Sequence, residues 1–300
     1  NITGGEPFMR EDLWDLLGDL HARRRAFSFA ILANGSFIDA RTAKRLRSFG
    51  PSFVQVSLDG DEATHDSIRG TGDHERVCRA VRHLRDNGIR TLISFTASRR
   101  NYRCFGDVAR LGMKLGASKV WMDRFIPCGG GASLKEEVLS PGEARDLCSA
   151  VLAVRQRSRR NPFCRTEIAM DRALQFLSGG GEPYRCAAGG SLICVMANGD
   201  LVPCRRMPIP VGNVLERPLR EIYRESPLLI ALRDGERRGE GCGGCFYARL
   251  CGGGLRCLSY ALTGDPFGKD PGCWVQSVSA IDGPVNSGPG NIRKACMGEG

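Results

Sequence analysis

The chain has 300 residues, of which 42% are hydrophobic and 25% charged, a composition typical of a soluble globular protein with one large domain and a smaller one. No stretch approaches the roughly 20 apolar residues of a membrane-spanning helix, and no basic leader or cleavage pattern opens the chain, so we expect a cytoplasmic protein without membrane contacts. The formal charge of +10 comes from scattered arginines with few aromatic residues among them, which argues against nucleic acid but suits an acidic substrate segment.

The first half of the chain alternates short apolar runs with amphipathic segments. One apolar stripe at helical spacing begins at Leu13, and another begins at Val77, with Asp73 as its expected cap and Gly88 as its stop. Strand and helix alternate with a period of about thirty residues, which predicts parallel βαβ units in an α/β barrel or doubly wound sheet. The runs expected to be buried strands are Phe27–Ala33, Phe53–Leu58, Arg90–Ala97 and Lys119–Ile126.

A helix with a strong start signal closes this α/β region. Ser140, Pro141 and Glu143 form a capping box with proline at the first helical position. Beyond residue 160 glycine becomes frequent and long periodic segments disappear, although short helices are expected at Pro218–Arg224 and Ser226–Asp234. We therefore expect an α/β domain over residues 1–165, a small cysteine-rich α+β domain over 166–280 and an extended tail over 281–300.

The chain opens with a glycine pair at the expected end of a strand. The first seven residues, Asn1 to Pro7, step from apolar Ile2 into Gly4, Gly5 and Glu6. In parallel α/β folds ligands bind at that edge of the sheet, and glycines let a ligand approach the backbone closely. A ligand loop and a bare structural turn both fit this pattern.

Motifs further along the chain make the pattern specific. Ala33-Asn34-Gly35 and Ser57-Leu58-Asp59-Gly60 are followed by His65-Asp66 and Arg69-Gly70. Together with Thr3-Gly4-Gly5-Glu6-Pro7, these segments resemble the radical S-adenosylmethionine (SAM) superfamily in order and spacing, over nearly the whole chain. The resemblance implies a partial parallel (β/α) barrel that begins at the end of the second barrel strand.

The resemblance also implies a set of SAM-binding residues. In the family the glycine-glycine-glutamate segment binds the amino group of the methionyl moiety, and the serine and aspartate that end the later strand face the nucleotide or substrate. Two arginines could pair with the cofactor carboxylate or ribose, although turn and salt-bridge roles fit the serine, the aspartate and the arginines equally well. The implied residues are Gly4, Gly5, Glu6, Ser57, Asp59, Arg69 and Arg124.

The family's catalytic cluster needs a C-x3-C-x2-C loop ahead of the glycine motif, and this chain contains no such spacing. We expect those cysteines upstream, outside this sequence, because a barrel without its first strand would expose apolar core. If they do not exist, the polypeptide cannot cleave the cofactor.

Cysteines are concentrated in the last third of the chain. Of the 14 in the sequence, eight fall between Cys186 and Cys273, in the spacings C-x12-G-x4-C and C-x2-C-x5-C-x5-C. Because no feature signals secretion, metal ligation accounts for them better than disulfides do. Eight thiolates make two sets of four, which suits two iron-sulfur clusters, while zinc also binds four thiolates.

The cysteine pattern resembles the family's twin-cluster extension, the SPASM domain, and the resemblance favours iron-sulfur clusters over zinc. It implies one auxiliary 4Fe-4S cluster on Cys242, Cys245, Cys251 and Cys273, and a second on Cys186, Cys194, Cys204 and Cys257. The family usually places a cysteine at position 255, where this chain has Leu255, as in the variant of pyrroloquinoline quinone maturases. The ligands around Cys194 and Cys257 therefore stay open.

The resemblance implies a radical SAM oxidoreductase. Its catalytic cluster would cleave SAM to a deoxyadenosyl radical, the auxiliary clusters would carry the substrate electron, and flavodoxin or ferredoxin would supply reducing electrons. The first hypothesis is a maturase of a ribosomally produced peptide or protein, with the Arg205 region near the substrate. Formylglycine formation is disfavoured, because Arg205 stands where sulfatase-maturating members carry an aspartate base. A small-molecule enzyme, such as one acting on a haem precursor, and a non-catalytic iron-sulfur or zinc binding module remain as alternatives.

Overall fold

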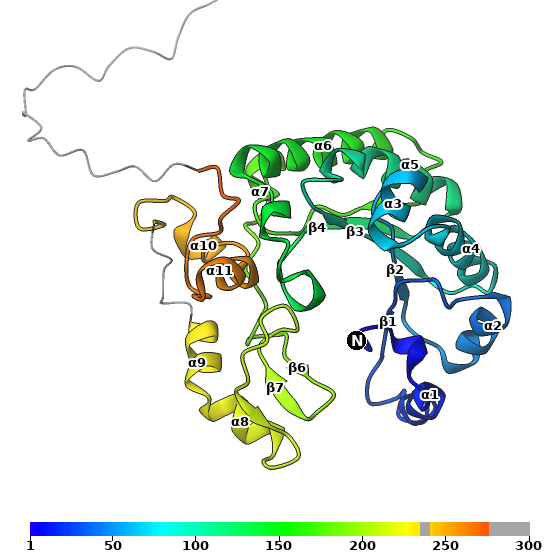
Figure 1. The fold of residues 1–300 in the computed structure, drawn as a ribbon, viewed down its shortest axis with the longest axis horizontal. Helices are drawn as coiled ribbons and strands as arrows, with labels where there is room; N and C mark the ends of the chain where they lie inside the picture. The colour runs from blue at the N-terminus through cyan, green and yellow to red at the C-terminus, as the bar shows by residue number, and fades with distance from the viewer. Residues whose placement is uncertain (235–240, 276–300) are drawn as a thin grey trace, which may run out of the picture.

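The computed structural model describes residues 1–234 and 241–275 (Figure 1). Five parallel strands form one sheet in chain order, which confirms the expected α/β architecture. Ile2 forms a further parallel bridge to Ile31, so the first residues continue the sheet at its edge. The strands are β1 (Ile31–Leu32), β2 (Val54–Ser57), β3 (Thr91–Ala97), β4 (Lys119–Arg124) and β5 (Glu167–Ile168).

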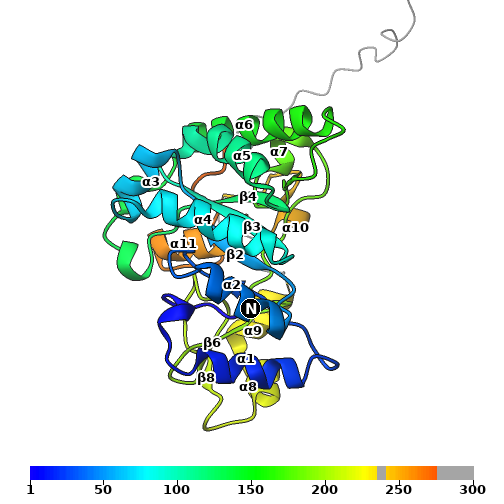
Figure 2. The ribbon, with the colours of Figure 1, turned by 90° about the vertical axis from the view of Figure 1, so that its right-hand side faces the viewer.

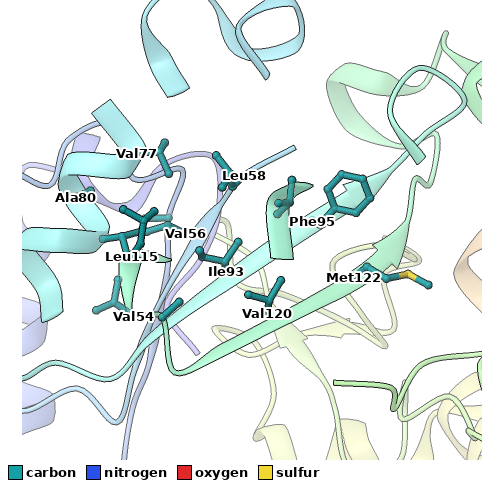
Figure 3. Packing of buried hydrophobic residues seen from close by; sticks show 14 of the residues in the cluster. Val54, Val56, Leu58, Val77, Ala80, Ile93, Phe95, Leu115, Val120 and Met122 are labelled. Atoms are coloured by element: carbon teal, nitrogen blue, oxygen red, sulfur yellow. The ribbon is translucent and has the colours of Figure 1, made fainter. Parts of the chain in front are cut away.

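Helices cover one face of this curved sheet and leave the other open toward the second half of the chain (Figures 1 and 2). Alternate strand residues such as Val54, Val56 and Val120 point into the apolar core under the helices (Figure 3). The intervening residues, including Gln55 and Trp121, face the inner side. The covering helices are α1 (Leu13–Ala22), α2 (Ala40–Phe49), α3 (Glu62–Arg69), α4 (Asp73–Asp86), α5 (Phe105–Leu115) and α6 (Pro141–Arg159).

The helix start and stop residues expected from the sequence are confirmed only in part. The Ser140 hydroxyl and the Glu143 carboxylate complete the expected capping box of α6. Asp73, however, is the first residue of α4 rather than its cap, which is Gly72. The Asp73 carboxylate instead bonds two side chains of neighbouring segments, described below. Gly88 lies just after the end of α4 in the left-handed region, with φ +66°.

The second half forms its own small core beside the inner side of the sheet (Figure 1). A three-stranded antiparallel sheet contains β6 (Cys194–Val195), β7 (Asp200–Val202) and β8 (Gly212–Asn213). Its helices are α7 (Phe176–Gly179), α8 (Leu219–Glu225), α9 (Pro227–Asp234), α10 (Ala248–Cys251) and α11 (Arg256–Thr263). Short 3-10 turns span Pro7–Met9, Tyr102–Cys104, Gly129–Gly131 and Lys135–Glu137. The expected tail over 281–300 lies outside the described residues.

Across residues 1–234 and 241–275, no helix combines the length and the apolar character needed to cross a bilayer.

Candidate cofactor and cluster sites

The glycine pair forms an open ledge where the first strand segment ends. The backbone of Ile2 is held by β1, through its N–H to Ala30 O at 2.8 Å and through Leu32 N–H to its carbonyl at 2.9 Å. A methyl group added at Gly4 or Gly5 would meet no atom within 4 Å. The space above this backbone is therefore free for a ligand to approach it.

Glu6 connects this ledge to the end of β1. One carboxylate oxygen accepts the Asn34 backbone N–H at 2.7 Å, and the other accepts the Phe8 N–H at 3.2 Å. Burial raises the pKa of the carboxyl, and the two backbone bonds oppose that shift. Each oxygen keeps further acceptor capacity toward the ledge, because a carboxylate oxygen has two lone pairs.

Asp59 and Arg69 pair with each other at the carboxyl edge of the sheet. The Arg69 guanidinium donates to Asp59 through Nε at 2.7 Å, and its Nη2 lies 2.6 Å from the same oxygen. The other Asp59 oxygen accepts the Thr96 N–H at 2.8 Å, and the side chain is 2% exposed. Ser57 lies on the inner face of β2, and its hydroxyl bonds no described residue. Asp59 and Arg69 therefore stabilise the carboxyl edge of the sheet, while the Ser57 hydroxyl is available to a ligand.

A buried histidine fixes the loop after β2. His65 is fully buried, and its Nδ1 accepts the Asp59 backbone N–H at 3.0 Å. The remaining proton is then on Nε2, which donates to Asp73 at 3.0 Å, and Ser36 donates to the other Asp73 oxygen at 2.5 Å. Burial lowers the pKa of His65, so the ring is neutral in the fold. This network joins the loop after β1 to helices α3 and α4 at one edge of the sheet.

Arg124 faces away from the inner side of the sheet. It shares a face of β4 with Val120 and Met122, and its guanidinium forms a bidentate pair with Asp270 at 2.8 and 2.5 Å. Both side chains are at most 4% exposed. Asp270 also accepts the backbone N–H groups of Leu255 and Gly272, at 2.8 and 2.9 Å. The pair fastens the cysteine-rich half of the chain to the barrel.

Four of the expected cluster ligands surround one narrow apolar cavity. Its other walls include Phe176, Tyr247 and the Lys269–Asp270 segment. Burial raises the pKa of the Cys251 thiol to about 11, and backbone N–H groups of Gly253 and Gly254 oppose the shift. The cysteines that line this cavity are Cys242, Cys245, Cys251 and Cys273, which we call the distal set.

The other four expected ligands line a second cavity of about 420 Å³, which opens onto the inner face of the sheet. Thr3, Gln55, Trp121 and Asp123 form the barrel side of its wall. Burial raises the pKa of Cys186, whose thiol receives backbone N–H bonds from Ala188 and Arg256. The cysteines of this cavity are Cys186, Cys194, Cys204 and Cys257, which we call the proximal set.

The wall of the large cavity carries more arginines than carboxylates. Asp123, 6% exposed, forms an ion pair with Arg206. Arg172 stacks over the Trp121 ring at 4.4 Å, and its Nε is buried without a hydrogen-bond partner. Arg205 has no ion-pair partner among the described residues. Arg172 and Arg206 therefore share the single Asp123 carboxylate and Arg205 has none, so the cavity is suited to an anionic ligand.

The thirteen cysteines in the described part of the chain are all free thiols. Within that part, no three His, Cys, Asp or Glu side chains converge closely enough to hold a single metal ion. Cys78 and Cys148, outside both sets, are buried in the barrel core as expected for small apolar side chains.

Two family models match parts of this chain. The family model of the radical SAM superfamily matches residues 1–111, and that of the SPASM iron-sulfur cluster-binding domain matches residues 186–246. The first covers the glycine ledge and β1 to β3. The second covers the proximal cysteines Cys186, Cys194 and Cys204 and the distal pair Cys242 and Cys245.

Relatives include both peptide-modifying and haem-forming enzymes. The PqqA peptide cyclase of Streptomyces rochei is 30% identical over 298 residues, covering 96% of this chain and 80% of that protein. The AdoMet-dependent heme synthase of Nitratidesulfovibrio vulgaris is 29% identical over 297 residues, covering 91% and 77%. Streptococcus suis SuiB has the same fold, with a TM-score of 0.72 at 18% identity, over 91% of this chain and 66% of SuiB.

Three features of the site did not emerge from the motifs. The His65 network, the Arg124–Asp270 pair and the arginines around Asp123 all depend on contacts between distant segments. Asp123 carried one usable signal, because alternation along the expected strand puts it on the face opposite Val120 and Met122.

Proposed function

This chain belongs to the radical S-adenosylmethionine superfamily, and on that premise we propose that it modifies a side chain of a ribosomally produced peptide or protein. It is an enzyme whose family uses SAM and 4Fe-4S clusters. When bound, SAM and the catalytic cluster would supply a deoxyadenosyl radical that takes a hydrogen atom from the substrate, and the auxiliary clusters would accept the electron left on the substrate. The observation that carries the proposal is the division of eight cysteines between two cavities, one of them open to the inner face of the barrel.

SAM would lie on the glycine ledge in this proposal. Gly4 and Gly5 offer backbone groups with free space above them, and Glu6 would accept the ammonium group of the methionyl moiety. Ser57 would hydrogen-bond the nucleoside portion. Asp59 and Arg69 would hold the edge in shape through their mutual pair. Arg124 has its donors engaged by Asp270, so we propose a structural role for it in place of the cofactor contact.

The two cysteine sets fit auxiliary clusters in their chemistry. Each set offers four free thiols around one cavity, which is the ligand number of a 4Fe-4S cluster. Backbone N–H groups point at sulfurs in both sets, as with Gly253 toward Cys251 and Ala188 toward Cys186. Such hydrogen bonds stabilise thiolates. Because these thiols must stay reduced to bind iron, we propose a cytoplasmic setting, with flavodoxin or ferredoxin as electron donor.

The large cavity is the proposed substrate site. It lies between the glycine ledge and the proximal cysteines, so a substrate there can reach both SAM and the first auxiliary cluster. Arg205, which has no ion-pair partner among the described residues, and Arg172, whose Nε has no hydrogen-bond partner, would bind a carboxylate of the substrate, which suits an acidic peptide segment. Peptide-bound SuiB, the same fold with its precursor peptide SuiA, supports a peptide as substrate.

The test uses the full-length protein, reconstituted anaerobically with iron and sulfide and supplied with SAM, a reductant and a short acidic peptide encoded beside its gene. We expect deoxyadenosine to form and the peptide mass to change. Arg172→Gln should raise the KM for the peptide about tenfold, while the exposed Arg159→Gln should leave it unchanged. Loaded protein that forms no deoxyadenosine with any such peptide would contradict the proposal.

A second candidate function is action on a haem precursor. The similarity to the heme synthase covers 91% of this chain, and free arginines in the cavity also suit porphyrin carboxylates. Offering an iron coproporphyrin in place of the peptide separates the two. Turnover of the porphyrin alone would favour this second candidate.

A further inference from the structure

The buried guanidinium of Arg256 lies beside the proximal cysteines without a carboxylate partner. Arg256 is the first residue of α11 and is 2% exposed. Its Nη1 is buried and has no hydrogen-bond partner, and no described carboxylate forms an ion pair with it. The face of Phe267 lies 4.9 Å from the guanidinium carbon, which offsets only part of the lost hydration. Asp265 is the one carboxylate that interacts electrostatically with Arg256, and it lies beyond ion-pair distance. A buried cation so weakly compensated is unfavourable, so the site favours a further anion.

The neighbouring anion is the thiolate set itself. Cys186 lies close enough to Arg256 for a direct electrostatic interaction, and its sulfur receives the Arg256 backbone N–H. Cys257, the next residue, belongs to the same set. Four thiolates around a 4Fe-4S core give a net negative unit, which is the partner that this guanidinium lacks.

The two cysteine sets differ in their charged surroundings. Arg172, Arg205, Arg206 and Arg256 lie near the proximal cavity, against two carboxylates, Asp123 and Asp265. The distal set has Lys269 and Asp270 as its charged neighbours, and Asp270 is paired with Arg124, so fewer positive charges surround it than surround the proximal set. Positive charge stabilises the more negative, reduced form of a cluster, so the proximal environment favours reduction more strongly.

Resting on the proposed function, we propose that Arg256 is the buried counter-charge of the proximal cluster and sets its reduction potential above that of the distal cluster. The cluster nearer the substrate cavity is then the first electron acceptor. Arg256 acts as a positioning charge and does not touch the substrate.

The experiment is an anaerobic redox titration of full-length, cluster-loaded protein, followed by electron paramagnetic resonance. In the wild type, the proximal cluster should be reduced at a higher potential than the distal cluster. Its signal is identified as the one that Cys204→Ser lacks. Arg256→Gln should lower the ratio of reduced to oxidised proximal cluster about tenfold at a given potential, a shift of ~59 mV for one electron. Arg256→Lys, which keeps the charge, should restore most of the shift. Arg185→Gln, an exposed neighbour of Cys186, is the matched control and should change little.

A second readout uses the protein without clusters. There the guanidinium is only weakly compensated, so Arg256→Gln should leave the thermal midpoint unchanged or raise it, whereas it should lower the midpoint of the loaded protein. Loaded clusters whose potentials do not respond to Arg256→Gln would overturn this inference alone. Loss of the proximal cluster from both the Gln and Lys variants would also overturn it, because charge would then not be the deciding property. Protein that binds zinc and no iron would overturn the proposed function as well.

Discussion

Neutralising Asp270 tests how the two halves of the chain are held together. Asp270→Asn keeps the shape of the side chain but removes its charge, and leaves the Arg124 guanidinium buried at 4% exposure without its paired carboxylate. Breaking a buried pair in this way costs about 3–5 kcal/mol. Two backbone donors, from Leu255 and Gly272, also lose a charged acceptor. We therefore expect the free energy of unfolding to fall by at least about 3 kcal/mol.

Denaturant unfolding, with and without clusters, measures this loss. Arg79→Gln, which breaks the exposed pair with Glu75, is the control and should cost about 0.5 kcal/mol at most. The double variant Arg124→Met with Asp270→Leu should cost less than Asp270→Asn alone, because no charge is stranded. Asp270→Asn should also loosen iron in the distal set, since the Asp270 carboxylate accepts the backbone N–H of Gly272, the residue before Cys273, at 2.9 Å. If Asp270→Asn lowers the free energy of unfolding no more than Arg79→Gln does, the Arg124–Asp270 pair does not hold the two halves of the chain together.

Three further predictions concern the barrel edge. Burial lowers the pKa of His65, which is neutral in the fold. The stability that His65 contributes to the fold is therefore complete above the unfolded pKa of about 6.5 and is lost as pH falls through the lower folded pKa. His65→Gln should reduce this loss of stability, measured as acid unfolding. Gly5→Ala, whose methyl group meets no atom, should leave the thermal midpoint unchanged but weaken SAM binding about tenfold by calorimetry, and Gly142→Ala, in the first turn of α6, should leave SAM binding unchanged. Gly35→Ala should destabilise the fold by about 1–3 kcal/mol in urea, because φ is +102° and Val56 and Val77 lie 3.3 Å from the added carbon; an unchanged midpoint would contradict this.

Local patterns predicted much of the barrel. The strand expected at Arg90–Ala97 occupies Thr91–Ala97, and the capping box at Ser140 starts α6 as expected. Apolar periodicity and turn chemistry are local properties, so short segments suffice to predict them. The Asp73 cap was wrong because Gly72 takes that place and the carboxylate bonds residues of other segments.

Tertiary contacts account for what the sequence did not predict. Arg124 was named as a possible partner for the cofactor carboxylate or ribose because a guanidinium suits a carboxylate, and its pairing with Asp270 was not foreseen. Its partner Asp270 lies 146 residues away, so no spacing rule connects the two. Alternation with Val120 and Met122 puts Arg124 on the helix-facing side of β4. Arg256 had no signal, because an arginine beside a cysteine is ordinary until its burial is known.

Iron counting on paired cysteine variants tests the central claim most directly. Full-length protein is reconstituted anaerobically, and iron and sulfide are measured for the wild type, Cys245→Ser, Cys204→Ser and the core control Cys78→Ser. We predict that each of the first two variants lacks one 4Fe-4S cluster, that their losses add in the double variant, and that Cys78→Ser retains the wild-type content. Equal iron in all four proteins, or zinc in place of iron, would contradict two thiolate-held clusters.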